Sequence, residues 1–371
     1  MMCGRVVFPH WDILLGVVAQ VYARQLPTFL IPGPSEDPDS IRDCLISLLQ
    51  LRQEEGYPAG GGHLLDLLQA FHPFKASDPR DKIYSLFSHS LDHQHLGLAV
   101  DYTIPAEDLY TTVAARVLAK CQDLDLLLSN LHGKTLDLAS WVPDWSTWHF
   151  GCDMAGMGFY ATLDAASGTP AVLRADETAR TLGVSGCLVS KINWVGERIL
   201  PYYVTHDGPV IVAQRKLWIE RQAETVRKLE QYMYPEETNI LAVLWKTLIA
   251  GATHDEVAPD DTYVEYFNAH LDATMQRSPL INRQARSFCD AVRWRSRYRC
   301  LATTENGYFG AVPQTAQVGD WVCMFHGGRH LFVVRPSGTN FEYVGHAYVH
   351  GLMTGQVLTA QWYKNITITL V

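Results

Sequence analysis

The chain of 371 residues is long enough for one large domain or two domains of ordinary size. Apolar residues make up 47% and charged residues 19%, which excludes a disordered chain and a charge-rich solenoid. The 30 Lys and Arg residues against 39 Asp and Glu residues give a net charge of −9, which argues against a general nucleic-acid binder. No apolar run reaches the roughly 18 residues of a membrane span, and residues 1–10 lack a secretory signal. We therefore expect a cytoplasmic protein with no membrane span.

The first 150 residues have the pattern of a helical region. Apolar residues at helical spacing predict helices over residues 11–22, 40–56, 64–71 and 109–117. Asp78-Pro79 predicts another helix start, because an aspartate accepts hydrogen bonds from unpaired N–H groups and a proline in the first turn loses none.

The middle of the chain changes from loop to strand and back to helix. Residues 151–207 predict a loop followed by a strand pair, because residues 182–194 alternate with period two. Residues 208–297 predict a second helical region, in which Val264, Phe267 and Leu271 form one apolar stripe.

The C-terminal region, residues 298–371, predicts antiparallel strands. Asn306-Gly307 is a strong hairpin turn between strands at 301–304 and 308–312, and further strands are expected near 321–325, 330–335 and 341–349. The predicted fold class is α+β, with mostly helical N-terminal and middle parts packed on a C-terminal antiparallel β-sheet or small barrel. We expect one compact unit.

No pattern indicates a metal or a cofactor. The eight cysteines are scattered without a CxxC pair, so we expect reduced thiols and no clustered zinc site. His89, His93 and His95 lie close together, but their spacing at a helix end does not favour a metal site. Residues 60–62 are glycines that lack the lysine of a P-loop.

An arginine-rich stretch between Arg283 and Arg299 is the basic concentration of the sequence. It fits a nucleic-acid contact, or a set of ion pairs with the acidic remainder of the chain, and the net charge favours the second interpretation. We therefore expect no nucleic-acid partner.

Residues 141–149 are the densest aromatic stretch. They contain Trp141, Trp145 and Trp148, followed by His149. Such a stretch can form the wall of an apolar ligand site, or it can be a rigid, packed connector in which Asp144 caps a turn.

The last predicted strand carries the clearest set of polar candidates. Period-two alternation places Glu342, Val344, His346, Tyr348 and His350 on one face. This face can line a polar pocket, or it can be the solvated side of an antiparallel sheet.

Several motifs in the same order resemble the fungal heterokaryon-incompatibility (HET) family. They cover roughly residues 60–360 and comprise Ser77-Asp78-Pro79-Arg80-Asp81-Lys82, Val100-Asp101-Tyr102, Leu138-Ala139-Ser140-Trp141-Val142-Pro143-Asp144-Trp145-Ser146, Asn306-Gly307-Tyr308-Phe309-Gly310 and Tyr348-Val349-His350-Gly351. The TIR-like motif that begins many family members is missing, so the resemblance is to the region that follows it. His346 and the stretch Gly310-Ala311-Val312-Pro313 depart from the usual family pattern.

The resemblance implies functions of different classes. Stand-alone chains similar to this region occur in fungal secondary metabolism, which implies a cofactor-independent cyclase that carries out an intramolecular Diels–Alder-type cycloaddition of an apolar terpenoid or polyketide. The alternatives are a non-enzymatic interaction module derived from an incompatibility protein, and a hydrolase. For the cyclase, the candidate hydrogen-bond donors are Tyr308, His346, Tyr348 and His350, and the candidate substrate walls are Trp141, Trp145 and Trp148 with His149 beside them.

Overall fold

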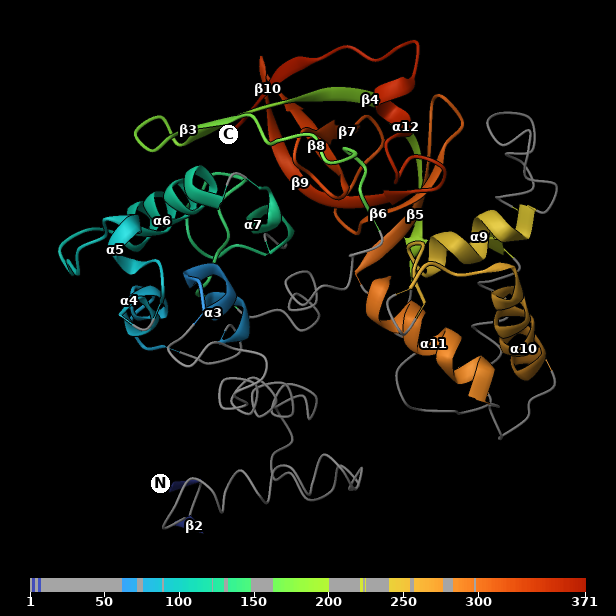
Figure 1. Cartoon of the computed structure of the whole chain (residues 1–371), viewed down its shortest axis with the longest axis horizontal. Coiled ribbons are helices and arrows are strands. Elements are labelled where there is room, and N and C mark those ends of the chain that lie inside the picture. The colour runs from blue at the N-terminus through green and yellow to red at the C-terminus, as the bar shows by residue number, and fades with distance from the viewer. Residues whose placement is uncertain are drawn as a thin grey trace. The chain divides into compact units, whose positions relative to one another are not determined.

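A computed structural model describes the larger part of the chain (Figure 1). The described residues are 2–3, 6–7, 62–71, 76–88, 90–121, 123–129, 133–147, 163–199, 221–222, 224, 240–253, 257–275, 283–296 and 298–371. The chain divides into two compact units, one of Met1–Ala106 with Trp145–Asp153 and one of Glu107–Asp144 with Met154–Val371. The predicted helices at 11–22 and 40–56 lie outside the described residues.

Among its described residues, the first unit contains three short helices, α3 (Leu64–Ala70), α4 (Asp81–Phe87) and α5 (His93–Leu96), and the two-residue strands β1 (Met2–Cys3) and β2 (Val6–Val7). Helix α3 confirms the prediction over 64–71. The buried Asp92 side chain accepts a hydrogen bond from the Leu64 N–H at 2.9 Å, so the start of α3 is held from a distant turn.

The Asp78-Pro79 motif starts a turn, and α4 begins three residues after Asp78 rather than at the proline. The Asp78 carboxylate accepts the Arg80 backbone N–H at 2.9 Å and forms a two-point ion pair with the guanidinium, at 3.0 and 2.8 Å. The other end of the guanidinium donates to the Ile104 carbonyl at 3.0 Å and to the Tyr102 carbonyl. In this motif the charged pair therefore fastens a turn to a neighbouring loop.

The helices of the second unit that the structure describes are α6 (Ala106–Cys121), α7 (Asp125–Leu128), α9 (Ile240–Leu248), α10 (Val264–Met275), α11 (Arg283–Arg295) and α12 (Gln356–Thr359), with a 3-10 turn η3 at Asp261–Tyr263. Helix α6 confirms the apolar stripe predicted at 109–117, since Leu109, Val113 and Val117 are buried. Helix α10 confirms that the segment at 264–271 is helical.

The strands of the second unit are β3 (Leu173–Asp176), β4 (Thr181–Arg198), β5 (Arg299–Thr304), β6 (Phe309–Pro313), β7 (Trp321–Phe325), β8 (Leu331–Ser337), β9 (Asn340–Val349) and β10 (Ile366–Leu370). They form one sheet in the order β10-β4-β5-β6-β9-β8-β7, and β3 lies outside this path as a partner of β4. Strand β4 also pairs with β7. The path therefore returns to β4, and the sheet curls around its own interior (Figure 1). The pairings are antiparallel apart from the contact between β9 and β10.

The β5–β6 hairpin confirms the predicted Asn306-Gly307 turn. The Gly307 N–H donates to the Thr304 carbonyl at 2.8 Å, and Gly307 has φ +81°, which favours glycine. The predicted strands near 321–325, 330–335 and 341–349 correspond to β7, β8 and β9.

The strand pair predicted within residues 182–194 is wrong in one respect, because these residues belong to a single strand of 18 residues, β4. Its hairpin partner, β3, precedes them. The first part of β4 pairs with β3 and β10. A bulge near Leu188–Ser190 and a shift near Ile192–Trp194 accompany its pairing with β7 along the middle part and with β5 along the last part.

Two apolar cores lie on opposite faces of the β5–β6 hairpin. In β5, Cys300 and Ala302 belong to the core inside the curled sheet, whereas Leu301 belongs to the core formed with α9, α10 and α11. All six residues of β5 are buried. A strand that is covered on both faces loses the alternation of apolar and polar residues that marks a half-exposed strand.

The fold is α+β, as the sequence predicts, with a curled and predominantly antiparallel C-terminal sheet. In the part of the chain that the structure describes, we find no helix with the length and apolar character that a membrane crossing requires.

Candidate functional site

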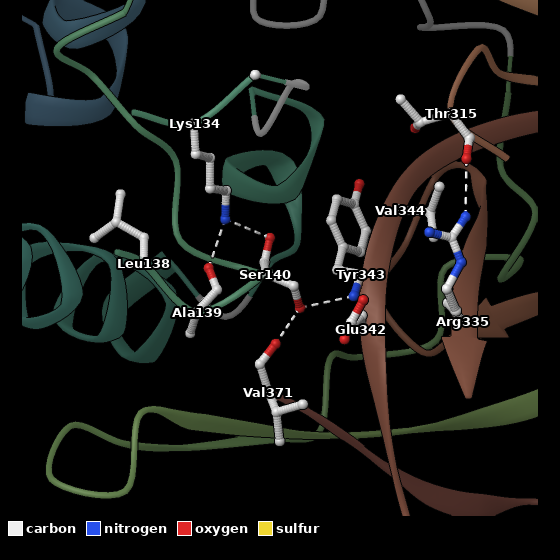
Figure 2. A pocket seen from close by; sticks show the side chains of 11 residues that line it. Lys134, Leu138, Ala139, Ser140, Thr315, Arg335, Glu342, Tyr343, Val344 and Val371 are labelled. Atoms are coloured by element: carbon white, nitrogen blue, oxygen red, sulfur yellow. Dashed lines mark hydrogen bonds between the residues drawn. The ribbon is translucent and has the colours of Figure 1, made fainter. Parts of the chain in front are cut away.

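A pocket of about 470 Å³ opens between the 133–140 segment and the β8–β9 pair (Figure 2). Its volume lies within the range of about 300–1,000 Å³ that is typical of small-molecule sites. The lining is mixed, with apolar side chains beside charged ones: Lys134, Leu138, Ala139, Ser140, Thr315, Arg335, Glu342, Tyr343, Val344 and Val371, together with Gly133.

Ser140 joins three segments at the base of this pocket. Its backbone N–H donates to the Val371 oxygen at 2.8 Å, and its hydroxyl donates to the same oxygen. The hydroxyl also accepts the Tyr343 backbone N–H at 2.7 Å (Figure 2). The loop is therefore tied to β9 and to the residue that follows β10.

Tyr343 is fixed at its other end as well. Its hydroxyl donates to the Leu127 carbonyl at 2.8 Å, and burial raises the pKa of the phenol. The phenol therefore acts as a fixed hydrogen-bond donor that holds β9 against α7.

Lys134 is the amine of the pocket. Its Nζ donates to the Ala139 carbonyl at 2.5 Å and to the Ser140 carbonyl at 2.8 Å (Figure 2). Desolvation lowers the pKa of Lys134 to about 7, against the opposing effect of the Asp144 carboxylate. At neutral pH the side chain is therefore shared between its ammonium and amine forms.

Asp144 holds the loop that carries Lys134. The buried carboxylate accepts the backbone N–H groups of Thr135 at 2.8 Å and Leu136 at 3.2 Å. This agrees with the interpretation that Asp144 supports a turn.

Arg335 is a second cation on the pocket wall. Its Nε and Nη2 atoms contact the two oxygens of the buried Asp320 at 2.9 and 3.0 Å, and Nη2 also donates to the Thr315 carbonyl at 2.8 Å. The hydrogen bond to Asp320 raises the pKa of Arg335, so the guanidinium stays charged. Within the described residues, no hydrogen bond occupies Nη1, which leaves its two N–H groups for a bound group.

The structure excludes the solvated interpretation for His346, Tyr348 and His350, whereas Glu342, which was predicted on the same face, is exposed. The prediction of one continuous face is wrong at this point, because a register shift between Val333 and Val334 in the β8–β9 pairing interrupts the alternation. Tyr308, His346, Tyr348 and His350 are buried, with 7–8% of their surface exposed. The Arg299 guanidinium donates to the His346 carbonyl and contacts the His346 ring nitrogen Nε2, and the Tyr348 hydroxyl lies 3.5 Å from Nδ1 of His350.

His346 and Tyr348 line a cavity of about 10 Å³ together with Arg295, Arg299 and His330. A space of this size holds about one water molecule. Burial and the neighbouring arginines lower the pKa of His330 to about 3, so this imidazole is neutral near neutral pH. The predicted face is thus gathered around a cavity much smaller than a terpenoid or polyketide.

Of the residues predicted to form the walls of the substrate site, the structure describes the first two tryptophans. Trp141 and Trp145 are buried, and the Trp141 indole N–H donates to the Arg180 carbonyl at 3.1 Å. Neither indole is among the side chains that line the 470 Å³ pocket. Trp148 and His149 lie outside the described residues.

The remaining candidates from the sequence are the clustered histidines, the arginine-rich stretch and the cysteines. Within the described residues, no three His, Cys, Asp or Glu side chains gather in a way that could hold a metal ion, and His89 lies outside them. Arg295 and Arg299 are buried rather than displayed on a surface. Among the described cysteines, Cys187, Cys300 and Cys323 are buried free thiols.

Sequence reasoning missed Lys134 and Arg335 as pocket residues. Lys134 lies four residues before Leu138-Ala139-Ser140, which begins one of the motifs that resemble the incompatibility family. This proximity was the signal in the sequence that could have pointed to Lys134. Its desolvation depends on β9 and Val371, which are more than 200 residues away in the chain.

Comparison with known proteins finds similarity to a domain and to a protein of heterokaryon incompatibility. Residues 229–366 match the Het-6 β-barrel domain. The chain is 24% identical over 359 residues to heterokaryon incompatibility protein 6, OR allele, of Neurospora crassa, a match that covers 79% of this chain and 51% of that protein. The chain thus spans about half the length of this curated relative. No solved structure matches significantly.

Proposed function

We propose that this chain, a relative of the heterokaryon-incompatibility proteins, is a cofactor-independent cyclase of fungal secondary metabolism. The proposed reaction is an intramolecular Diels–Alder-type cycloaddition of an apolar terpenoid or polyketide. The observation that carries the proposal is the 470 Å³ pocket, in which apolar groups of Leu138, Val344 and Val371 accompany the cations Lys134 and Arg335. We keep the cytoplasm as the proposed location.

A cycloaddition requires a folded substrate and an electron-poor dienophile. Holding the reacting carbons in contact can lower a barrier by up to about 7–11 kcal/mol, and less where the reaction is already intramolecular. One donor aimed at a carbonyl where charge develops contributes roughly 2.7–4 kcal/mol. The pocket offers two such donors, the Lys134 ammonium and the Nη1 group of Arg335.

We place the substrate in this pocket rather than beside His346 and Tyr348, because a 10 Å³ cavity cannot admit it without rearrangement. In this proposal the buried side chains of His346, Tyr348 and His350 support β9 and do not contact the substrate. The fixed Tyr343 then keeps the β9 wall of the pocket in place.

The test is a product analysis with a pocket-blocking variant. Purified, EDTA-treated protein is mixed with a linear polyene that bears a diene and an unsaturated carbonyl, and the rate and product ratio are compared with the buffer reaction. Leu138→Trp fills the pocket and should abolish any acceleration, whereas Val318→Trp, at a site 65% exposed, should retain it. An unchanged rate and product ratio with the wild-type protein would remove the cyclase proposal.

A second candidate function is a non-enzymatic interaction module. The match of residues 229–366 to the Het-6 β-barrel domain favours it, because the matched relative is named as an incompatibility protein. Growth arrest on expression in a fungal host, equal for wild type and Leu138→Trp, would support this candidate over the cyclase.

A further inference from the structure

The arrangement around Lys134 offers one open position on the nitrogen. Two of its tetrahedral positions point to the Ala139 and Ser140 carbonyls, at 2.5 and 2.8 Å, and a third is the bond to the side-chain carbon. The fourth position carries a proton in the ammonium form and a lone pair in the amine form. Among the described residues that line this pocket, Lys134 is also the only lysine.

The charge state makes the lone pair available. The pKa of about 7 means that about half of the Lys134 side chains are neutral at pH 7, compared with about one in 3,000 for an ordinary lysine. The charged groups around Lys134 are Asp144, which raises its pKa, and Arg335 and Glu342, which line the same pocket. A desolvated amine in a hydrophobic pocket is a common form of lysine nucleophile.

We propose that the pocket binds an α,β-unsaturated aldehyde and that Lys134 bonds it covalently as an imine. The inference rests on the proposed function for its role in cyclisation, but the bond itself does not require a cycloaddition.

The step needs no reagent besides water and protons. The Nζ lone pair attacks the carbonyl carbon, and the carbonyl oxygen takes a proton to give a carbinolamine. Nitrogen loses one proton, the hydroxyl takes a proton from solvent and leaves as water, and the nitrogen lone pair forms the C=N bond of an iminium without oxidation or reduction. Loss of the remaining N–H proton to solvent gives the imine, and hydrolysis reverses the sequence.

The two backbone carbonyls also suit the product. An iminium nitrogen keeps one N–H, so either the Ala139 or the Ser140 carbonyl can still accept a hydrogen bond from it. The positive nitrogen withdraws electrons from the adjoining C=C bond. That withdrawal activates a dienophile, so the proposed bond would supply the electron-poor partner of the cyclisation.

The experiment traps the imine by reduction. Wild-type protein is incubated at pH 7 with a limiting amount of cinnamaldehyde and cyanoborohydride, digested, and mapped by mass spectrometry. We expect the Lys134 peptide to gain the mass of the aldehyde less one oxygen atom, on the order of tenfold or more above the exposed Lys364. Leu138→Trp should block the labelling, and Lys134→Arg should remove it with an unchanged thermal unfolding transition.

Two results would overturn the inference. One is wild-type labelling of Lys134 that does not exceed that of Lys364. The other is undiminished labelling of Lys134 in Leu138→Trp, which would show that the amine does not react within the pocket. An undiminished cyclisation rate in Lys134→Arg would remove the role of the imine in cyclisation. The proposed function is tested separately, since trapped imine without accelerated cyclisation would retain the Lys134 site and remove the cyclase.

Discussion

Ser140→Ala tests whether the base of the pocket depends on one hydroxyl. The substitution removes the bond donated to the Val371 oxygen and the 2.7 Å bond accepted from the Tyr343 N–H. Two such bonds contribute about 1–3 kcal/mol, and the part-buried Tyr343 N–H left without its acceptor adds about 1 kcal/mol or more. The expected loss is about 2–4 kcal/mol, or at least about 30-fold in the folding equilibrium.

Urea unfolding at equilibrium measures this loss, with Ser185→Ala as the matched control. The Ser185 hydroxyl makes a single exposed bond to the Asn365 side chain, at 2.9 Å, so its removal should change stability by less than about 0.5 kcal/mol. Equal effects of the two substitutions would refute the reasoning, because they would show that the buried position of the Ser140 bonds adds nothing.

Three further predictions concern charge and packing. Asp144→Asn should move the pH midpoint of imine trapping downward, because the carboxylate raises the lysine pKa, whereas the exposed Asp137→Asn should leave it unchanged. Gly186→Ala should destabilise the protein by about 1–3 kcal/mol, since a Cβ there would lie 2.1 Å from a backbone oxygen, and Gly183→Ala should be nearly neutral because its nearest contact is 3.5 Å. His330 has its pKa lowered from 6.5 to about 3, so the unfolded state takes up its proton first and stability is lost as pH falls from 6.5 toward 3. Urea titrations across that range should show His330→Leu gaining stability relative to wild type, and parallel curves would contradict this.

Local chemistry was sufficient to predict many of the elements. Asn306-Gly307 specifies a tight turn whatever surrounds it, because glycine adopts the positive φ that the hairpin needs. The apolar spacing of Val264 and Phe267 likewise specifies a helix with one buried side, and Phe267 is buried as expected. The resemblance to the incompatibility proteins rests on short motifs, and the match to the Het-6 β-barrel domain agrees with it.

Burial of the last strand was decided by the tertiary structure. The alternation of His346, Tyr348 and His350 is the same for a solvated face and a lined interior, so the pattern alone left both open. The curled sheet covers one side of β9 and other segments cover the rest, and all three side chains are buried. Arg299, which contacts the buried His346, lies 47 residues away from it in the chain.

The candidate site depends on the same long-range assembly. The sequence by itself determined only that Lys134 lies four residues before the Leu138-Ala139-Ser140 part of a motif that resembles the family. A lysine in that position has an ordinary pKa unless water is removed from it. Lys134 loses its water because Ser140 binds Val371 and Tyr343, which brings β9 and the end of β10 to the loop. Desolvation is a property of what surrounds a group in space, and no local pattern of residues can encode it.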